Sequence, residues 1–347
     1  MDARPLASRL EGKKISHWKI IEKRIKDKND SSGCFSSCYI VENENGEKAF
    51  LKAFNYYYVF GAPNTNSMDL LKMMSQNFTY ERDLLKYCED SKMKRVVTAI
   101  ETGEYKEEGE IFPVPYIVFE IAEGSLKTIN NLLEPDLSWK LIAFHGALLG
   151  LSELHSAKIV HQDIKPSNIL IFGKNYSKIS DLGSATQFEN DSNWNTDNHM
   201  GDMRYAPIEL IYGYFSSDWN TRRFGADLFM MGGILVYMIS GVNYLSLLVS
   251  NLPDSIKPHN YEGTYKEIIP YVMQSYYLVM DQIGNDIPIQ IRRDLIEILQ
   301  QLCHPVPEER GNPNGLKVTI PKYSLVRYIS IVDRLSKEIL WKKYDRK

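Results

Sequence analysis

The sequence predicts an α+β fold in which a small antiparallel sheet precedes a larger helical part. Three early segments, Trp18–Arg24, Phe35–Glu42 and Glu47–Phe54, are short runs rich in β-branched or aromatic residues, with turn formers between them. After Gly124, apolar residues recur instead at the spacing of an amphipathic helix. This change of pattern indicates two lobes that join near residues 120–125.

The other predicted elements follow the same patterns along the chain. Gly61, Pro63 and several asparagines indicate a loop between Tyr56 and Ser67. The last segment has its apolar residues on one face, which predicts an extra helix packed on the body. We expect one further strand, Tyr116–Ile121, and helices at Asp69–Tyr87, Leu137–His155, Ala226–Ser240, Tyr265–Met280 and Arg292–Cys303. The predicted domains are an N-terminal extension at 1–17, a small lobe at 18–120, a large lobe at 121–315 and a C-terminal helical extension at 316–347.

The composition is that of an ordinary globular protein. Of 347 residues, 44% are hydrophobic and 24% are charged, which leaves ample apolar material for a core. The net charge of -3 gives no indication of a nucleic-acid-binding surface. The cysteines are too few and too scattered for a disulfide scaffold or a metal cluster: Cys34, Cys38, Cys88 and Cys303.

Targeting and membrane signals are not apparent in the sequence. The N-terminal residues are polar and lack the apolar stretch of a signal peptide. The most apolar run, Leu228–Ile239, is shorter than the about 20 residues that cross a bilayer. We therefore expect a cytoplasmic protein without membrane or nucleic-acid partners.

Two short polar segments in the second part carry groups suited to phosphate chemistry. The first reads HQDIKPSNIL at 161–170, and the second reads KISDLG at 178–183. The Asp163 carboxylate can accept a hydroxyl proton, and Lys165 can neutralise charge on a phosphoryl group. Asn168 and Asp181 supply hard oxygen ligands of the kind that Mg²⁺ prefers.

Together these segments resemble the catalytic loop and the metal-binding turn of the eukaryotic-type, or Hanks-type, protein kinases. A lysine two residues after the aspartate, followed by proline, is similar to the serine/threonine branch of that family. The resemblance extends over residues 18–315, and the run YAPIEL at 205–210 is similar to stand-alone kinases of bacteria. It implies a bilobal kinase fold and Mg-assisted, in-line transfer of the γ-phosphoryl group of ATP to serine or threonine hydroxyls of proteins.

The resemblance also assigns roles to individual residues. Lys52, at the end of a predicted strand, corresponds to the lysine that grips the α- and β-phosphates, and Glu81 corresponds to its ion-pair partner. The implied catalytic residues are Asp163, Lys165, Lys52 and Glu81, and the implied metal ligands are Asn168 and Asp181. The implied nucleotide-binding residues are Gly33, Phe35, Cys38, Lys52, Glu120, Ala122 and Leu170, with Phe119 beside the adenine pocket. ATP and Mg²⁺ are the implied cofactors, with Mn²⁺ as an alternative metal.

Other matching positions have structural roles in the family. Glu209, near the end of the activation segment, corresponds to a glutamate that pairs with a buried arginine, here Arg310. Asp227 and Gly232 correspond to residues of a core helix that anchors the catalytic loop.

The nucleotide site departs from the family pattern at two places. The phosphate-covering loop, aligned as SSGCFSSC at 31–38, keeps only the middle glycine and the aromatic residue. Phe50 stands two residues before Lys52, where the family has a small alanine over the adenine ring. A phenyl group there crowds or mimics the base, unless the strand is offset by one residue or the ring is tilted.

Two further departures lie close to the catalytic residues. Gln162 replaces an arginine that clamps an activation-loop phosphate, and an amide cannot make that bidentate ion pair. We therefore expect that phosphorylation of this segment is not a strict on-switch. Asp202 stands where serine/threonine kinases carry a threonine, and it is a candidate partner for Lys165.

Two alternative functions stay open. Phe50 and the serine-rich loop favour a pseudokinase, a binding or scaffold protein with weak or no turnover. A small-molecule phosphotransferase of the antibiotic- or choline-kinase kind shares the fold but lacks the segment around Glu209 and the arginine matching Arg310. Regulation is expected from partners, from a homodimer through the C-terminal helix, or from the segment 56–76.

Overall fold

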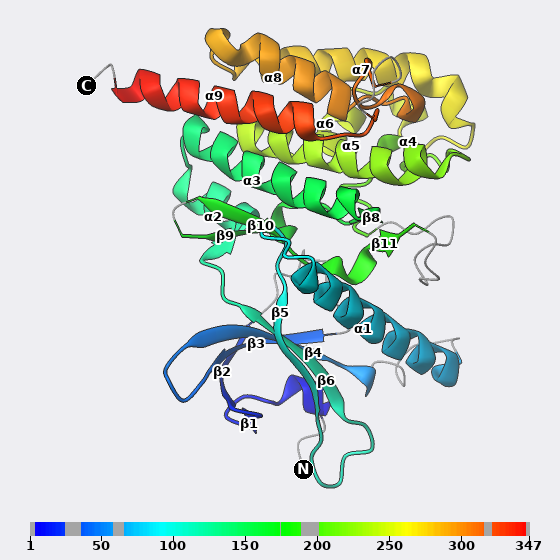
Figure 1. Ribbon diagram of the computed structural model, residues 1–347. Helices are drawn as coiled ribbons and strands as arrows, with labels where there is room; N and C mark the ends of the chain where they lie inside the picture. The colour runs from blue at the N-terminus through cyan, green and yellow to red at the C-terminus, as the bar shows by residue number, and fades with distance from the viewer. Residues whose placement is uncertain are drawn as a thin grey trace. The chain divides into compact units, whose positions relative to one another are not determined.

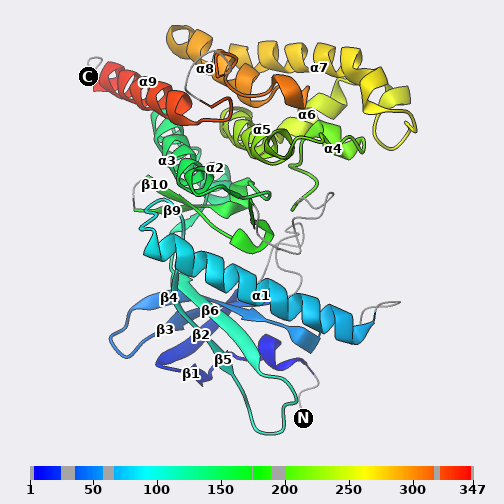
Figure 2. The same cartoon turned by 45° about the vertical axis from the view of Figure 1, so that its right-hand side comes forward.

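The computed structural model describes residues 4–24, 36–57, 66–173, 175–188, 201–315 and 321–344. Contacts divide the chain into two compact units. The N-terminal unit comprises Met1–Met93 and Val97–Ala122, and the C-terminal unit comprises Lys94–Val96 and Glu123–Lys347. Figures 1 and 2 show the elements of each unit from two directions.

The N-terminal unit is built on an antiparallel sheet. Among the described residues this sheet has six strands in the order β1-β2-β3-β4-β6-β5 (Figure 1). The strands are β1 (Lys14–Ile15), β2 (Trp18–Arg24), β3 (Ser36–Glu42), β4 (Lys48–Phe54), β5 (Ala99–Tyr105) and β6 (Val114–Glu120). The sequence correctly predicts β2, β3, β4 and β6 to within a few residues, whereas β1 and β5 were not expected.

The N-terminal segment covers one face of this sheet. Leu6 and Leu10 are fully buried in a cluster with Tyr39 of β3 and Leu51 of β4. The Tyr39 hydroxyl donates a hydrogen bond to the Ala7 carbonyl oxygen at 2.8 Å. Because buried apolar area stabilises a fold by about 25 cal/mol per Å², the residues before β2 contribute to the core of this unit.

The long helix of the same unit, α1 (Ser67–Asp90), buries one stripe of side chains. The Asn66 side chain accepts a hydrogen bond from the Met68 backbone N–H at 3.0 Å and so caps the helix. Phe78 meets Phe54 of β4 with ring centroids 5.0 Å apart. The buried stripe consists of Met74, Phe78, Glu81, Leu84, Leu85 and Cys88, which recur at helical spacing. Glu81 therefore carries a carboxylate into an otherwise apolar face.

The C-terminal unit is mainly helical. Its described α-helices are α2 (Leu126–Leu133), α3 (Leu137–Ser156), α4 (Ile208–Ile211), α5 (Trp219–Ser240), α6 (Tyr244–Ser250), α7 (Tyr265–Asn285), α8 (Ile289–Leu302) and α9 (Val326–Tyr344). The expected helices correspond to α3, α5, α7, α8 and α9, whereas the short α2, α4 and α6 were not expected. The predicted α+β class, with a sheet-based first part and a helical second part, is confirmed.

The helix α5 lies in the core of the C-terminal unit. It runs for 22 residues, and an 18-residue window within it has a mean hydropathy of 1.3, so length and composition alone would let it cross a membrane. It is the one helix of the described ranges that meets this test, and 78% of the apolar window is buried inside the unit. Such burial is typical of the core helix of a globular domain.

The last helix, α9, packs against the body of the C-terminal unit, as expected. Figure 1 shows it beside α3 and α8. Val332 and Leu335 are fully buried. Arg327 Nη2 lies 2.6 Å from Glu297 Oε1 of α8, and Arg334 forms an ion pair with Asp294 of the same helix.

Short strands position the polar segments that the sequence singled out. β9 (Ile169–Phe172) pairs with both β7 (Gly124–Ser125) and β10 (Tyr176–Ile179). β8 (Ile159–Val160) pairs with β11 (Thr186–Gln187). The segment 161–168 therefore connects two strand pairs, and Asp181 follows the second strand of a hairpin.

Candidate functional site

In the N-terminal unit, a buried ion pair joins strand β4 to helix α1. Lys52 Nζ lies 2.8 Å from Glu81 Oε1 and 3.1 Å from Glu81 Oε2. The Glu81 side chain is 4% exposed and that of Lys52 is 16% exposed. A buried carboxylate is costly without a charged partner, so the contact with Lys52 accounts for Glu81 on the apolar stripe. The expected contact between these two residues is present.

Phe50 shares a face of β4 with Lys52. Ala49, Leu51 and Ala53 are fully buried in the core cluster, whereas Phe50, Lys52 and Phe54 alternate with them and are half-buried. The strand pairing is continuous from Lys48 to Phe54, with no bulge against β3. Because every second residue of a strand points to the same side, this regular pairing places Phe50 and Lys52 on one face. The one-residue offset that would have turned Phe50 away from Lys52 does not occur.

Several of the other residues that were expected to bind the nucleotide lie on strands of the two units. Cys38 of β3 is directly opposite Lys52 of β4, and Phe119 of β6 is opposite Phe50. Glu120 ends β6, and Ala122 is the last residue of the N-terminal unit. Leu170, in the C-terminal unit, is half-buried on β9 opposite Lys178 and Ser125. Gly33 and Phe35 lie outside the described residues.

In the C-terminal unit, the Asp227 carboxylate of α5 holds the start of the segment 161–168. The backbone N–H of His161 donates to Asp227 Oδ2 at 2.7 Å, and that of Gln162 donates to Asp227 Oδ1 at 2.9 Å. His155 Nε2 of α3 lies 2.9 Å from Asp227 Oδ2. Asp227 is fully buried, so these contacts compensate its charge and fix the chain just before Asp163.

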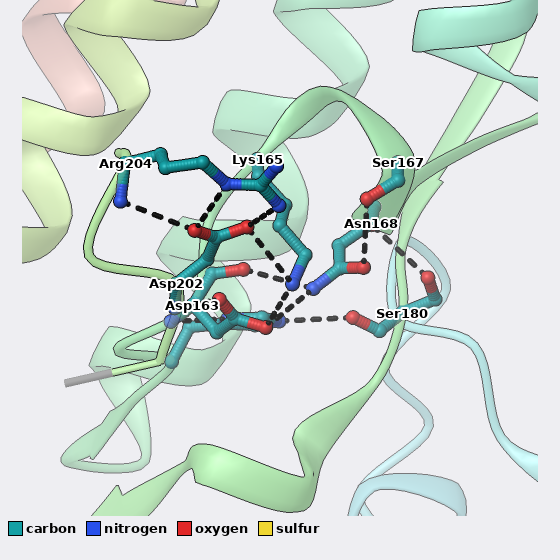
Figure 3. A network of polar contacts seen from close by, with 8 residues as sticks. Asp163, Lys165, Ser167, Asn168, Ser180, Asp202 and Arg204 are labelled. Carbon is teal, nitrogen blue, oxygen red and sulfur yellow. Dashed lines mark hydrogen bonds and ion pairs between the residues drawn. The ribbon is translucent and has the colours of Figure 1, made fainter. Parts of the chain in front are cut away.

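The side chains of Asp163, Lys165 and Asn168 form one contact set (Figure 3). Lys165 Nζ lies 2.8 Å from Asp163 Oδ2. The Asn168 amide nitrogen donates to the Asp163 carbonyl oxygen at 2.9 Å and to Asp163 Oδ2 at 3.1 Å. All three residues are buried. The structure thus brings together three of the residues that the sequence singled out.

His161 links this set to the strand that precedes Asp181. Its Nδ1 accepts a hydrogen bond from the Asp163 backbone N–H at 3.2 Å, so the proton of the neutral ring is on Nε2. Nε2 then donates to the Ser180 carbonyl oxygen at 3.0 Å. The loop that carries Asp163 and the turn that carries Asp181 are therefore fixed to each other.

Burial raises the pKa of the Asp163 carboxyl above its ordinary value. The charge of Lys165 opposes this rise, whereas the nearby Asp181 carboxylate adds to it. Asp163 and Asp181 are therefore close enough to interact electrostatically within the C-terminal unit. A carboxyl with a raised pKa is a stronger proton acceptor once it is ionised.

The backbone is strained at two of these positions. Gln162 has φ 62° and Asp181 has φ 64°, in the left-handed region that residues other than glycine rarely adopt. Such conformations cost about 1 kcal/mol or more and persist where the surroundings enforce them. These left-handed residues turn the backbone sharply, one just before Asp163 and the other at Asp181.

Asn168 and Asp181 offer oxygen donors that could hold a magnesium ion together with phosphate oxygens. Because the Asn168 nitrogen donates to Asp163, the side-chain oxygen, which accepts a long 3.5 Å hydrogen bond from Ser167 Oγ, is the atom that can coordinate a cation. Within the described ranges, no group of three or more His, Cys, Asp or Glu side chains could hold a metal ion by itself. Mg²⁺ in phosphate-transfer sites takes one or two protein oxygens and fills its other positions with phosphate oxygens and water, which suits this donor pair.

Asp202 lies against Asp163 and pairs mainly with Arg204, which the sequence reasoning did not identify. The Asp202 backbone N–H donates to Asp163 Oδ1 at 2.7 Å. Arg204 Nε donates to Asp202 Oδ1 at 2.8 Å, whereas Lys165 Nζ is 4.0 Å from Asp202 Oδ2. The expected pairing of Asp202 with Lys165 is therefore only a long contact, because the Arg204 guanidinium holds the carboxylate.

The Gln162 side chain is held by buried hydrogen bonds. Its amide nitrogen donates to the Ser184 carbonyl oxygen at 2.9 Å and to Thr186 Oγ1 at 3.2 Å. The side chain of Arg223, on α5, donates to Gln162 Oε1. An arginine 61 residues away in the chain therefore supplies a buried positive charge beside Gln162, and no local sequence signal indicates it.

The expected ion pair between Glu209 and Arg310 is present and fully enclosed. Arg310 Nη1 and Nη2 lie 2.9 Å from Glu209 Oε1 and Oε2. Arg310 also donates from Nε to the His304 carbonyl oxygen at 2.9 Å. This fork geometry is typical of strong arginine–carboxylate pairs.

Comparison with known proteins finds a kinase domain. A family model described as a protein kinase domain matches residues 32–317. The serine/threonine-protein kinase par-4 of Caenorhabditis briggsae is 30% identical over 158 residues, 43% of this chain and 22% of that protein. A probable serine/threonine-protein kinase of Clostridium perfringens is 29% identical over 133 residues, 37% of this chain and 18% of that protein. The serine/threonine-protein kinase chk-1 of Caenorhabditis elegans is 31% identical over 131 residues, 36% of this chain and 25% of that protein. The matched stretch spans a quarter or less of each relative.

Proposed function

This chain belongs to the protein kinase family, and from that premise we propose that it transfers the γ-phosphoryl group of ATP to serine or threonine hydroxyls of proteins. The observation that carries the proposal is the buried contact set of Asp163, Lys165 and Asn168. Serine and threonine are favoured over tyrosine because Lys165 follows Asp163 by two residues and is itself followed by Pro166.

Asp163 orients the attacking hydroxyl and receives its proton. Its carboxylate is held by the Asn168 amide and the Asp202 backbone N–H, so its direction is fixed before the substrate arrives. Lys165 is 2.8 Å from the same carboxylate. Its charge stabilises the negative oxygens of the phosphoryl group as that group moves in line towards the hydroxyl.

Lys52 binds the phosphates of ATP. Glu81 holds the ammonium group from two oxygens, which orients it and offsets its charge before the nucleotide binds. Asn168 and Asp181 would hold Mg²⁺, which neutralises phosphate charge when it is bound. Phe119, Glu120 and Ala122 remain the proposed contacts of the adenine ring, and Cys38 and Leu170 its apolar neighbours.

Protein substrates are the proposed partners, and the cytoplasm is the proposed location. The small-molecule alternative is disfavoured by Glu209 and Arg310, whose buried pairing is present here. Homodimerisation through α9 is less favoured than in the sequence-based expectation, because Val332 and Leu335 of this helix are already buried within the unit.

Transfer from γ-labelled ATP tests the proposal. The purified chain is incubated with peptides that contain only serine, threonine or tyrosine as acceptor, and separately with choline and with an aminoglycoside. We expect label on the serine and threonine peptides, and its loss when EDTA removes divalent cations. Label on tyrosine alone would overturn the serine/threonine assignment, and label on a small molecule alone would overturn the protein-kinase activity.

A second candidate function is nucleotide or partner binding without efficient turnover. Phe50 favours it, because the phenyl group shares a face with Lys52 and a bound purine on that face would meet it. Thermal shift with Mg²⁺-ATP for the wild type and for Phe50→Ala separates the two functions. A shift in the wild type without transfer would favour a nucleotide-binding protein, and a shift that appears only in Phe50→Ala, together with no transfer by the wild type, would favour a partner-binding protein that does not use ATP.

A further inference from the structure

Lys165 lies between two buried carboxylates. Its Nζ is 2.8 Å from Asp163 Oδ2 and 4.0 Å from Asp202 Oδ2. The Lys165 side chain is 2% exposed and the Asp202 side chain is 3% exposed. In such surroundings water screens charges weakly, so both carboxylates attract the ammonium group strongly. The two acids and one base leave one negative charge uncompensated among these three residues.

Arg204 supplies the compensating charge from the solvent side. Nε is 2.8 Å from Asp202 Oδ1, and Nη2 is 2.5 Å from Asp202 Oδ2. The Arg204 backbone N–H also donates to Asp202 Oδ1, at 3.1 Å. Figure 3 shows the guanidinium on one side of the Asp202 carboxylate and Lys165 on the other. A planar guanidinium that contacts both carboxylate oxygens fixes the orientation of that carboxylate as well as its charge.

The backbone at 201–202 is held against the Asp163 side chain. A Cβ atom on Gly201 would lie 2.3 Å from Asp163 Oδ1, so the chain touches the Asp163 side chain directly. The Asp202 backbone N–H is bonded to the same Asp163 oxygen at 2.7 Å. A rotation of the Asp202 side chain leaves these backbone contacts in place, and a shift of about 1 Å from the present 4.0 Å would bring the carboxylate within hydrogen-bond distance of Lys165.

We propose that Arg204 is a positioning residue that holds the Asp202 carboxylate away from Lys165. Lys165 is then left to Asp163 and to the transferred phosphoryl group. This inference rests on the proposed transfer reaction, and it assigns to Arg204 an effect that depends on the charge of Asp202. An arginine that acts independently of Asp202 would not show that dependence, and the Asp202–Lys165 distance in the Arg204→Ala variant separates positioning from general stabilisation of the loop.

A double-mutant cycle tests the dependence. We expect Arg204→Ala to lower kcat about tenfold, an effect of the size seen for residues within one charge network, with KM for ATP changed less than about twofold. In the Asp202→Asn background the same substitution should lower kcat less than about twofold. Arg204→Lys should recover part of the loss, because it keeps the charge without the fork. Arg334→Ala is the matched control. The Arg334 side chain is 57% exposed, close to the 52% of Arg204, and it also pairs with an aspartate, Asp294 of α8.

Equal losses in the Asp202 and Asp202→Asn backgrounds, or no loss in either, would overturn the inference. A crystal structure of Arg204→Ala gives a readout that does not need turnover. The Asp202 carboxylate should move from 4.0 Å to hydrogen-bond distance from Lys165 Nζ. An unchanged separation would contradict the positioning role. Absence of transfer by the wild type would instead contradict the proposed function, while the crystallographic distance would still decide the role of Arg204.

Discussion

Two buried glutamates, one in each unit, have cationic partners of different kinds. Glu209 meets the fully buried Arg310 through two parallel contacts of 2.9 Å, and Arg310 also donates to backbone carbonyl oxygens. Glu81 meets Lys52, whose side chain remains 16% exposed. The Arg310 side chain is 0% exposed, so the first pair offers no cation to a ligand and we assign it a role in the fold. The second pair keeps a cation that solvent, or a ligand, can reach.

Removing Arg310 tests whether the buried Glu209–Arg310 pair stabilises the fold. Arg310→Ala leaves Glu209 buried without its partner, so we expect the free energy of unfolding to fall by about 3–5 kcal/mol. Urea denaturation followed by circular dichroism measures the change. Arg334→Ala, which removes an exposed partner of Asp294, should stay within about 0.5 kcal/mol of the wild type. A loss below about 1 kcal/mol for Arg310→Ala would show that the enclosed pair does not stabilise the fold.

Removing Lys52 should affect activity much more than stability. Lys52→Met removes the cation that faces Glu81, and because the Lys52 side chain is 16% exposed, water can reach the vacated place, so we expect a loss of about 1–2 kcal/mol in unfolding free energy. Transfer from ATP should fall by about 100-fold or more, because a fixed positive charge is lost from the phosphates. Denaturation and initial-rate measurements on one preparation give both numbers. A stability loss as large as that of Arg310→Ala would remove the distinction between the two pairs.

The pH dependence of kcat/KM tests how burial affects a third acidic group, the carboxyl of Asp163. Burial raises its pKa, so the proton is held at a pH where an exposed aspartate is already ionised. Because a proton acceptor must be ionised, kcat/KM should be full at high pH and fall as the pH drops through this raised pKa. The acidic limb should lie above the value of about 3.9 that is ordinary for aspartate. A limb at or below that value would show that burial does not control this group.

The sequence predicted the regular elements whose pattern is local. The apolar residues in 69–87 and 137–155 mark α1, which buries a stripe that recurs at helical spacing, and α3, which is buried around most of its circumference. It did not predict β5, whose sequence AIETGEY mixes a glycine and two glutamates into the strand. Nor did it predict that Leu6 and Leu10 enter the core, because isolated apolar residues in a polar segment carry no period.

At the candidate site, the sequence predicted residues and the structure supplied their partners. Asp163, Lys165 and Asn168 are within five positions of one another and were recognised together. The partners of Gln162 and Asp202 were not recognised. Arg223 of the distant helix α5 donates to Gln162. The side-chain geometry pairs Asp202 with Arg204 instead of with Lys165. Neither contact can be predicted from the spacing of residues along the chain.

The most direct test of the account compares the transfer rates of wild type and Asp163→Asn at saturating Mg²⁺-ATP. Asparagine keeps the shape of the side chain but removes the proton acceptor, so we expect a rate at least about 100-fold lower. The thermal shift caused by Mg²⁺-ATP should be retained, which shows that the variant still folds and binds the nucleotide. Equal transfer rates in the two proteins would contradict the role of Asp163 on which the proposed function depends.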